Sequence, residues 1–120
     1  MIATINFTYG KKKVKLLSNA VTALHYKQVF HKDLLVMMLI DAPAGKMNDA
    51  EAVEMAQEMC YIMACQAAKK EMSYEGYLEW LESQEQMDLI ERSFDIIDVF
   101  KGQMPGLSES KKKEEQLSAD

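Results

Sequence analysis

The sequence has little cysteine and no long apolar run. Only Cys60 and Cys65 occur among 120 residues, and five helical steps turn them about 140° apart, so they cannot pair locally or chelate a metal together. No basic stretch at the start leads into an apolar one, and the longest unbroken apolar run, Leu34 to Ile40, has seven residues. We therefore expect no signal peptide, no membrane span and a cytoplasmic location.

The sequence also lacks the motifs of common catalytic and metal sites. It contains no Gly-x-Ser-x-Gly elbow, no glycine-rich phosphate loop and no His-Glu-x-x-His pair. Its two histidines, His25 and His31, have no carboxylate or thiol at ligand spacing beside them. We therefore expect no enzyme, no cofactor and no metal.

Charge is distributed unevenly along a chain whose formal net charge is −5. Residues 1–46 hold seven lysines against two aspartates, whereas residues 47–104 hold four basic against thirteen acidic residues. A basic end on an acidic body argues against general nucleic-acid binding. Acidic residues at helical spacing form two rows that we interpret as solvated faces: Glu51, Glu54 and Glu58, and Glu91, Asp95 and Asp98.

Apolar residues make up 48% of the chain, which is enough for one globular domain of this length. Residues 2–9 alternate in polarity, and Val14 and Leu16 continue that period, so we expect a β-hairpin over about 2–17. Ser18 or Asn19 then caps a helix over about 19–30. Residues 32–41 form either a buried helix or a strand, and a loop over 42–48 follows.

The second half of the chain predicts further helices. Asn48 has the position of an N-cap for a helix over about 49–70, and Ser73 caps a short aromatic helix. Ser83 with Gln86 suggests a capping box for a last helix that Gly102 ends. The expected fold is mainly α with a short N-terminal hairpin (α+β), a compact bundle of about four to five helices over residues 1–104. A flexible polar tail over 105–120 follows.

Ten methionines in 120 residues are a high share. The third helix, which holds three of them, has an unusually wide apolar face of roughly 200°, where a helix on a monomer core needs about 100°. Either this helix is central in the bundle, or part of its face meets a partner. Aromatic residues of the next helix form a second candidate patch. The candidate partner-binding residues are Met55, Met59, Ile62, Met63, Tyr74, Tyr77 and Trp80.

Two parts of the chain resemble the tail assembly chaperones of siphoviruses and of prophages from Gram-positive hosts. One is the basic hairpin Ile5-Asn6-Phe7-Thr8-Tyr9-Gly10-Lys11-Lys12 followed by Tyr26-Lys27-Gln28-Val29-Phe30-His31-Lys32-Asp33-Leu34-Leu35. The other is Met55 to Lys70 followed by Tyr74-Glu75-Gly76-Tyr77-Leu78-Glu79-Trp80-Leu81. The likeness covers roughly residues 3–102, and His31 departs from it where the family more often has glycine.

The resemblance implies a small, mainly helical protein that binds the phage tape measure protein. Such a chaperone keeps its partner soluble in the host cytoplasm until tail-tube subunits polymerise around it, and is not expected in the mature virion. The tail tube protein is a further expected partner, and the family transfers no catalytic residues.

Two other classes of protein remain open. A structural virion or head-tail connector protein would stay in the finished particle. A DNA-binding regulator would need several basic residues on one helix face, and the last helix has only Arg92 and Lys101. Exposed apolar patches could also let the chain form a homo-oligomer.

Overall fold

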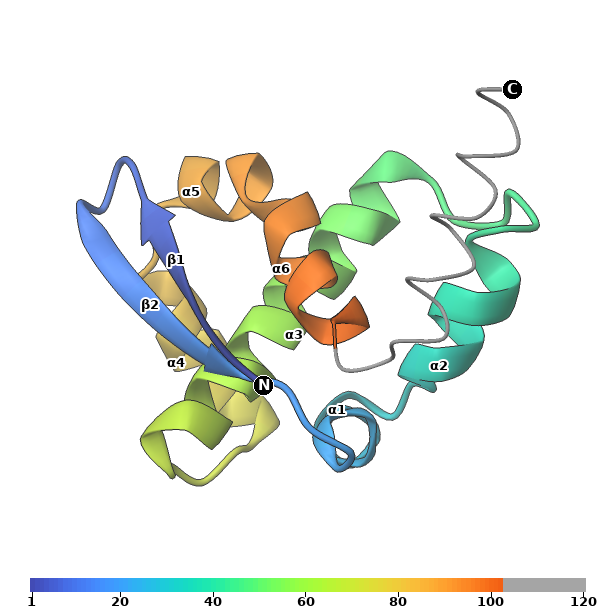
Figure 1. The fold of residues 1–120 in the computed structure, drawn as a ribbon, viewed down its shortest axis with the longest axis horizontal. Helices are drawn as coiled ribbons and strands as arrows, with labels where there is room; N and C mark the ends of the chain where they lie inside the picture. Colours follow the sequence, from blue (N-terminus) through green and yellow to red (C-terminus); the bar gives the residue numbers. More distant parts are fainter. Residues whose placement is uncertain (103–120) are drawn as a thin grey trace.

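A two-stranded hairpin and a helical body make up residues 1–102, which the computed structural model describes (Figure 1). The expected boundary at 104 and the expected tail over 105–120 lie outside these residues. The elements are β1 (Ile2–Phe7), β2 (Lys12–Leu17), α1 (Thr22–Phe30), α2 (Leu34–Val36), the π-helix η1 (Met37–Asp41), α3 (Asp49–Ala68), α4 (Tyr74–Glu82), α5 (Gln86–Glu91) and α6 (Ser93–Lys101). The mainly α fold with a short N-terminal hairpin is thereby confirmed.

The hairpin forms where polarity alternates in the sequence. Its antiparallel register pairs Ile2 with Leu17 and Phe7 with Lys12. Because successive strand residues point to opposite faces, Ile5, Phe7 and Leu16 are buried together on the inner face. That face covers α3 and α6, which contact β2 and β1 respectively.

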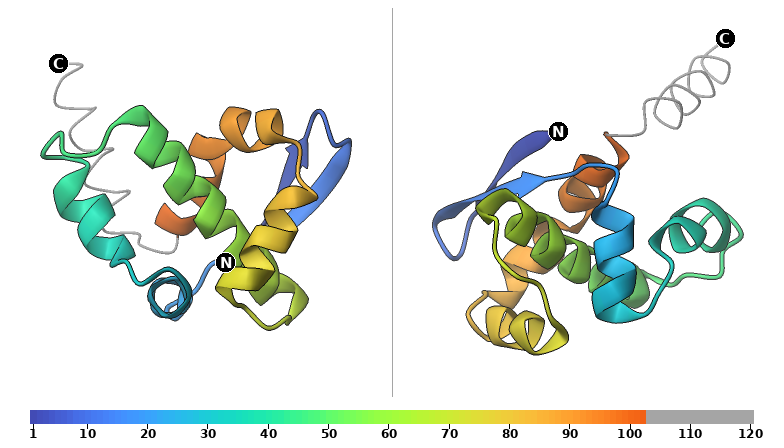
Figure 2. Two further views of the ribbon diagram at one scale, coloured as in Figure 1. Left: turned by 180° about the vertical axis from the view of Figure 1, so that it is seen from behind. Right: turned by 90° about the horizontal axis from the view of Figure 1, so that it is seen from below.

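Helix α3 runs through the middle of the molecule and contacts β2, α1, α4, α5 and α6 (Figures 1 and 2). Its predicted cap is confirmed, since the Asn48 side chain accepts a hydrogen bond of 2.8 Å from Glu51 N. The hairpin and the α2–η1 segment lie at opposite ends of the molecule, on either side of this helix.

The first helix begins three residues later than the sequence suggested. Val21 occupies the N-cap position without a side-chain hydrogen bond. Asn19 instead closes a turn before the helix, accepting a hydrogen bond from Val21 N at 3.0 Å, while Thr22 Oγ1 accepts one from Asn19 N at 3.0 Å. Asparagine thus competes for backbone groups outside the helix, as its short polar side chain favours.

The predicted last helix is wrong in two respects. Ser83 does not cap it, because its hydroxyl donates to Trp80 O at the end of α4, and Glu85 holds the N-cap position of α5 without a side-chain bond. The helix also breaks at Arg92 into α5 and α6. The Ser93 hydroxyl donates to Leu89 O at 2.7 Å beside that break, and such a bond to the preceding turn bends helices.

Candidate interaction surface

The candidate residues on α3 lie in the core. Met59, Ile62 and Met63 are fully buried, and Met55 is 3% exposed. The wide apolar face of α3 therefore belongs to a helix that is central in the bundle and covered by its neighbours on several sides. Other elements cover these four side chains in this conformation, and their part in partner binding stays a prediction.

The aromatic candidates divide between core and surface. Tyr77 is buried, with its ring centroid 4.9 Å from that of Phe30 and 5.6 Å from that of Tyr61. Trp80 is partly buried against Tyr61, at 5.7 Å between centroids. Only Tyr74 exposes about half of its surface, 54%. The structure therefore removes Tyr77 from the accessible surface and leaves Tyr74 and the rim of Trp80 on it.

Close approach of α4 to α3 requires glycine at position 76. A Cβ there would lie 2.6 Å from the Tyr61 hydroxyl, well inside van der Waals contact. The same hydroxyl accepts a hydrogen bond of 3.1 Å from Ser73 N, just before α4. Tyr61 thus fixes the start of α4, and with it the position of the aromatic residues.

Glu58 is not part of a solvated acidic face, which corrects the sequence interpretation of that row. Its side chain is buried and accepts a hydrogen bond of 2.5 Å from the Tyr26 hydroxyl. Lys32 Nζ lies 3.3 Å from both carboxylate oxygens and 3.5 Å from Glu54 Oε1. Burial together with the hydrogen bond to Glu58 raises the pKa of Tyr26 far above its ordinary range.

The ion pair also governs the titration of the lysine. Burial lowers the pKa of Lys32, but the negative charges and hydrogen bonds of Glu58 and Glu54 outweigh that effect, so the pKa is raised. Lys32 therefore stays protonated and neutralises the buried carboxylate. The cluster links α1, α3 and the connection between α1 and α2, and its three polar groups satisfy one another, so it stabilises the packing of these segments.

Two further buried polar side chains join segments that are distant in the sequence. No sequence motif predicted these interactions. Asp88 on α5 accepts hydrogen bonds from Tyr9 N at 2.8 Å and Gly10 N at 2.7 Å in the hairpin turn. Gln66 on α3 donates to Leu17 O at 2.7 Å and to Thr22 Oγ1 at 2.9 Å. Because these contacts span more than 40 residues, local spacing cannot reveal them.

A group of exposed apolar side chains lies on α2 and η1. The segment is helical and not a strand, but it is buried on one side only, through Leu34 and Met38. Its outer face consists of four large apolar side chains that are 39–58% exposed, and we call it the α2–η1 surface: Leu35, Val36, Leu39 and Ile40. A helix that is apolar all round is normally covered, so this face lacks a cover within residues 1–102.

An apolar groove adjoins this surface. It has a volume of about 530 Å³ and is lined mainly by small and apolar side chains of Met1, the connection between β2 and α1, and the helices α1, α2 and α6, among them Ala20, Ala23, Leu35 and Phe100. Leu35 belongs to both the groove and the α2–η1 surface. On the neighbouring α1, Leu24 is 52% exposed as well. The two features together form an extended apolar region at one end of the molecule.

A second exposed apolar strip runs along α5 and the start of α6. Met87, Ile90 and Phe94 are all exposed, Phe94 the most of them at 76%. These three residues are separated from the α2–η1 surface in sequence and lie on other helices.

Within residues 1–102 no group of three or more His, Cys, Asp or Glu side chains is arranged to hold a metal ion. Both cysteines of this part are free and buried. No helix among these residues combines the length and the apolar character needed to cross a membrane.

Comparison of the chain with protein-family models, curated proteins and solved structures finds no match to any of them.

Proposed function

We propose that this chain is a tail assembly chaperone that binds the tape measure protein of a phage and keeps it soluble during tail-tube assembly. The observation that carries the proposal is the α2–η1 surface, four neighbouring large apolar side chains left open to water. The chain then acts by covering an apolar stripe of its partner and carries out no catalysis.

The spacing of this surface suits a helical partner. Leu35 with Leu39, and Val36 with Ile40, are four residues apart, so they form two adjacent ridges between which side chains of another helix can pack. Amphipathic helices bind such surfaces through apolar residues at positions i, i+3, i+4 and i+7. Covering each half-exposed side chain contributes about 1 kcal/mol of binding free energy.

The family resemblance over residues 3–102 supports the choice of partner. A tape measure protein is long and helical with apolar stripes, and it would aggregate if those stripes stayed open to water. A binding protein with an apolar groove beside an apolar helix face has the chemistry to prevent this. We propose that the complex forms in the host cytoplasm, that the tail tube protein displaces the chaperone, and that the mature virion lacks it.

Co-expression tests the proposal with matched variants. The chain is produced with the long helical protein encoded downstream in the same gene cluster, and the soluble, co-purifying fraction of that protein is measured. We expect the double substitution Val36→Gln and Ile40→Gln to remove about 2 kcal/mol of binding, a loss of about thirtyfold in affinity. The matched double substitution Met87→Gln and Phe94→Gln should leave binding unchanged.

Two outcomes would contradict the proposal. If the downstream protein aggregates equally with and without the chain, the chaperone function fails. If the chain is abundant in purified virions, a structural or connector role replaces it. A loss of binding in the Met87 and Phe94 variant alone would keep the function but move the surface to α5 and α6.

A further inference from the structure

A groove lies along β2, over the end of α3 and beside α4. Its volume is about 480 Å³. The floor is small and apolar, because Ala67 and Ala68 follow Ala64 by three and four residues on α3 and so share its face. Val14 of β2 and Trp80 of α4 complete the apolar lining. The groove therefore admits a segment of another molecule close to the backbone of α3.

The charged residues that line this groove in the described chain are all lysines of β2: Lys12, Lys13 and Lys15. All three are exposed, and none of them forms an ion pair within residues 1–102. Lys12 Nζ lies 5.9 Å from the centroid of the Phe7 ring, a contact that leaves its charge in place. The groove thus carries charge of one sign without a counter-charge.

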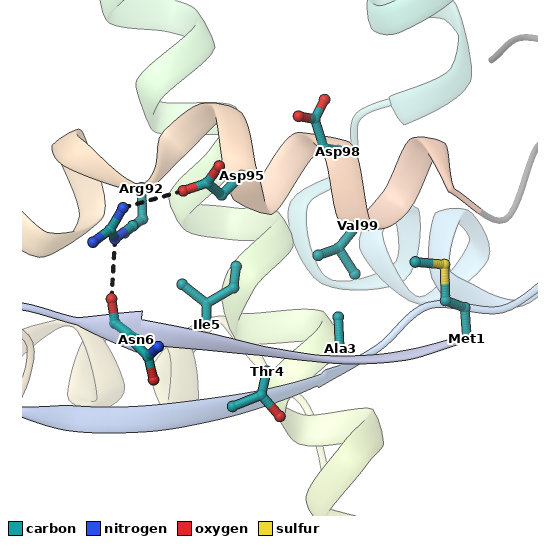
Figure 3. Close-up of a pocket in the computed structure, with 9 residues that line it drawn as sticks. All are labelled: Met1, Ala3, Thr4, Ile5, Asn6, Arg92, Asp95, Asp98 and Val99. Atoms are coloured by element: carbon teal, nitrogen blue, oxygen red, sulfur yellow. Dashed lines mark hydrogen bonds and ion pairs between the residues drawn. The ribbon is translucent and has the colours of Figure 1, made fainter.

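The groove along the other strand of the hairpin differs in this respect (Figure 3). It lies between β1 and α6, where Arg92 pairs with Asp95 at 3.4 Å and donates to Asn6 O at 3.0 Å. Charges of both signs satisfy one another there, so charge selects no occupant. Along β2 it does.

The acidic side of α4 faces away from the β2 groove. Its three glutamates are turned about 100–160° from Trp80 around the helix axis: Glu75, Glu79 and Glu82. Residues 69–71, directly after the floor, add two lysines and one glutamate. The elements that form the groove therefore do not supply the missing negative charge.

We propose that this groove binds an acidic segment of another protein. Glutamate or aspartate side chains of the segment would pair with the lysines of β2, and its apolar side chains would pack on the alanines and on the rim of Trp80. The hairpin and the α2–η1 surface lie at opposite ends of the molecule (Figures 1 and 2). This binding and the chaperone function can therefore be tested independently.

The environment of Trp80 favours a protein segment over a nucleic acid. Single-stranded nucleic acids stack their bases on open aromatic faces beside basic residues. The Trp80 ring stacks on Tyr77, with 6.2 Å between centroids, and packs against Tyr61 at 5.7 Å. Because these two rings cover it, little of its face remains for a base. The formal net charge of −5 also repels a long polyanion more than a short acidic segment.

Self-association through the groove would differ from this binding in a measurable way. If two copies joined groove to groove, their lysines would face one another, which like-charge repulsion disfavours. If the groove bound a different face of a second copy, the contact would be heterologous and would continue into rings or filaments. A segment of another protein gives a complex of limited size, so particle size separates these occupants.

Trp80 is the only tryptophan of the chain, so its fluorescence reports on the groove directly. The probe is a blocked hexapeptide that alternates glutamate and leucine, and its control carries lysine in place of glutamate. We expect the glutamate peptide to shift the Trp80 emission to shorter wavelength as it covers the rim of the ring. Its affinity should fall about tenfold between about 0.05 M and about 0.5 M salt, because screening weakens exposed charge pairs. The lysine peptide should give no shift.

Two double variants locate the binding on the unmodified fold. Lys13→Glu with Lys15→Glu should weaken the glutamate peptide about tenfold and let the lysine peptide bind. Lys27→Glu with Lys46→Glu changes the net charge equally at exposed lysines outside the groove, and should change the affinity less than about twofold. If the first variant does not fold, the comparison of the two peptides on the unmodified chain decides.

Four results would overturn the inference. The first is an unchanged Trp80 emission with saturating glutamate peptide, or an equal shift with both peptides. The second is equal weakening by the two double variants, because net charge and not the groove would then bind the peptide. The third is a larger shift with single-stranded oligothymidylate than with the peptide, which would make the occupant a nucleic acid. The fourth is growth of particle size with protein concentration that Lys13→Glu with Lys15→Glu removes, which would make it a second copy.

Discussion

At the scale of single residues, burial separates side chains that the sequence treats alike. Glu54 and Glu58 are one helical turn apart on α3, and both belong to an acidic row. The Glu54 side chain is 61% exposed, whereas that of Glu58 is 5% exposed and bonded to Tyr26 and Lys32. Removing a charge should therefore have very different consequences at the two positions.

We expect Glu58→Gln to lower the free energy of unfolding by about 1–3 kcal/mol, because Lys32 loses its buried counter-charge. Glu54→Gln is the matched control and should change it by less than about 0.5 kcal/mol. Urea unfolding followed by circular dichroism measures both. Equal effects of the two substitutions would show that the buried cluster does not stabilise the fold.

At the scale of elements, the helices differ in how many neighbours hold them. α3 contacts the hairpin strand β2 and four other helices, whereas the α2–η1 segment packs chiefly on α1 and keeps its outer face open. Elements with few buried apolar contacts open locally at a lower free energy than the core. The segment that we propose for partner binding is thus held by few neighbouring elements.

Hydrogen exchange should resolve this difference. We expect the amides of residues 37–41 to exchange by local opening at least about tenfold faster than the amides of residues 59–63 in α3. Native-state exchange with increasing denaturant checks it, since local opening is insensitive to denaturant and global unfolding is not. Similar rates and similar denaturant dependence in both segments would contradict the expectation.

The elements that local chemistry determines were predictable, and those that depend on distant contacts were not. Asn48 and Ser73 cap α3 and α4 as their spacing indicated, because a capping bond joins residues three apart. The break at Arg92 and the exposure of Ile40 were missed. The first depends on how α5 and α6 pack, and the second on which apolar side of the α2–η1 segment finds a cover.

The same distinction applies to the candidate site. An apolar face of roughly 200° on α3 fitted both a core helix and an interface, and only the positions of its neighbours could decide. The pattern could not show that Met59 is covered by other elements while Leu39 is not. Both are large apolar residues in helical segments, so sequence alone ranks them equally.

At the scale of the whole molecule, high pH should unfold the chain through its buried acids. Burial raises the pKa of the Cys60 thiol from 9.0 to about 12, and burial raises the pKa of Tyr26 and Tyr77 above their ordinary value of 10.0. The folded chain therefore holds protons that the unfolded chain releases. The stability that these groups contribute is present below about pH 9 and is lost as the pH rises toward 12.

We expect the free energy of unfolding to fall above pH 9, by up to about 1.4 kcal/mol per pH unit for each group that titrates. Tyr26→Phe should make the decline above pH 10 shallower. Tyr9→Phe, at an exposed tyrosine, is the matched control and should leave the slope unchanged. Urea titrations at several pH values measure the slope, and an unaltered slope in Tyr26→Phe would contradict the assignment.

The hydrogen bonds from Tyr9 and Gly10 to Asp88 also determine when the hairpin can be fixed during synthesis of the chain. Tyr9 precedes Asp88 by 79 positions in the sequence, and Gly10 precedes it by 78. A ribosome adds roughly 5–20 residues per second, so the hairpin turn exists for roughly 4 to 16 seconds before its acceptor has been made. Throughout that interval neither α5 nor α6 contacts β1 and β2. The apolar face of the hairpin is then exposed to any factor that binds nascent chains.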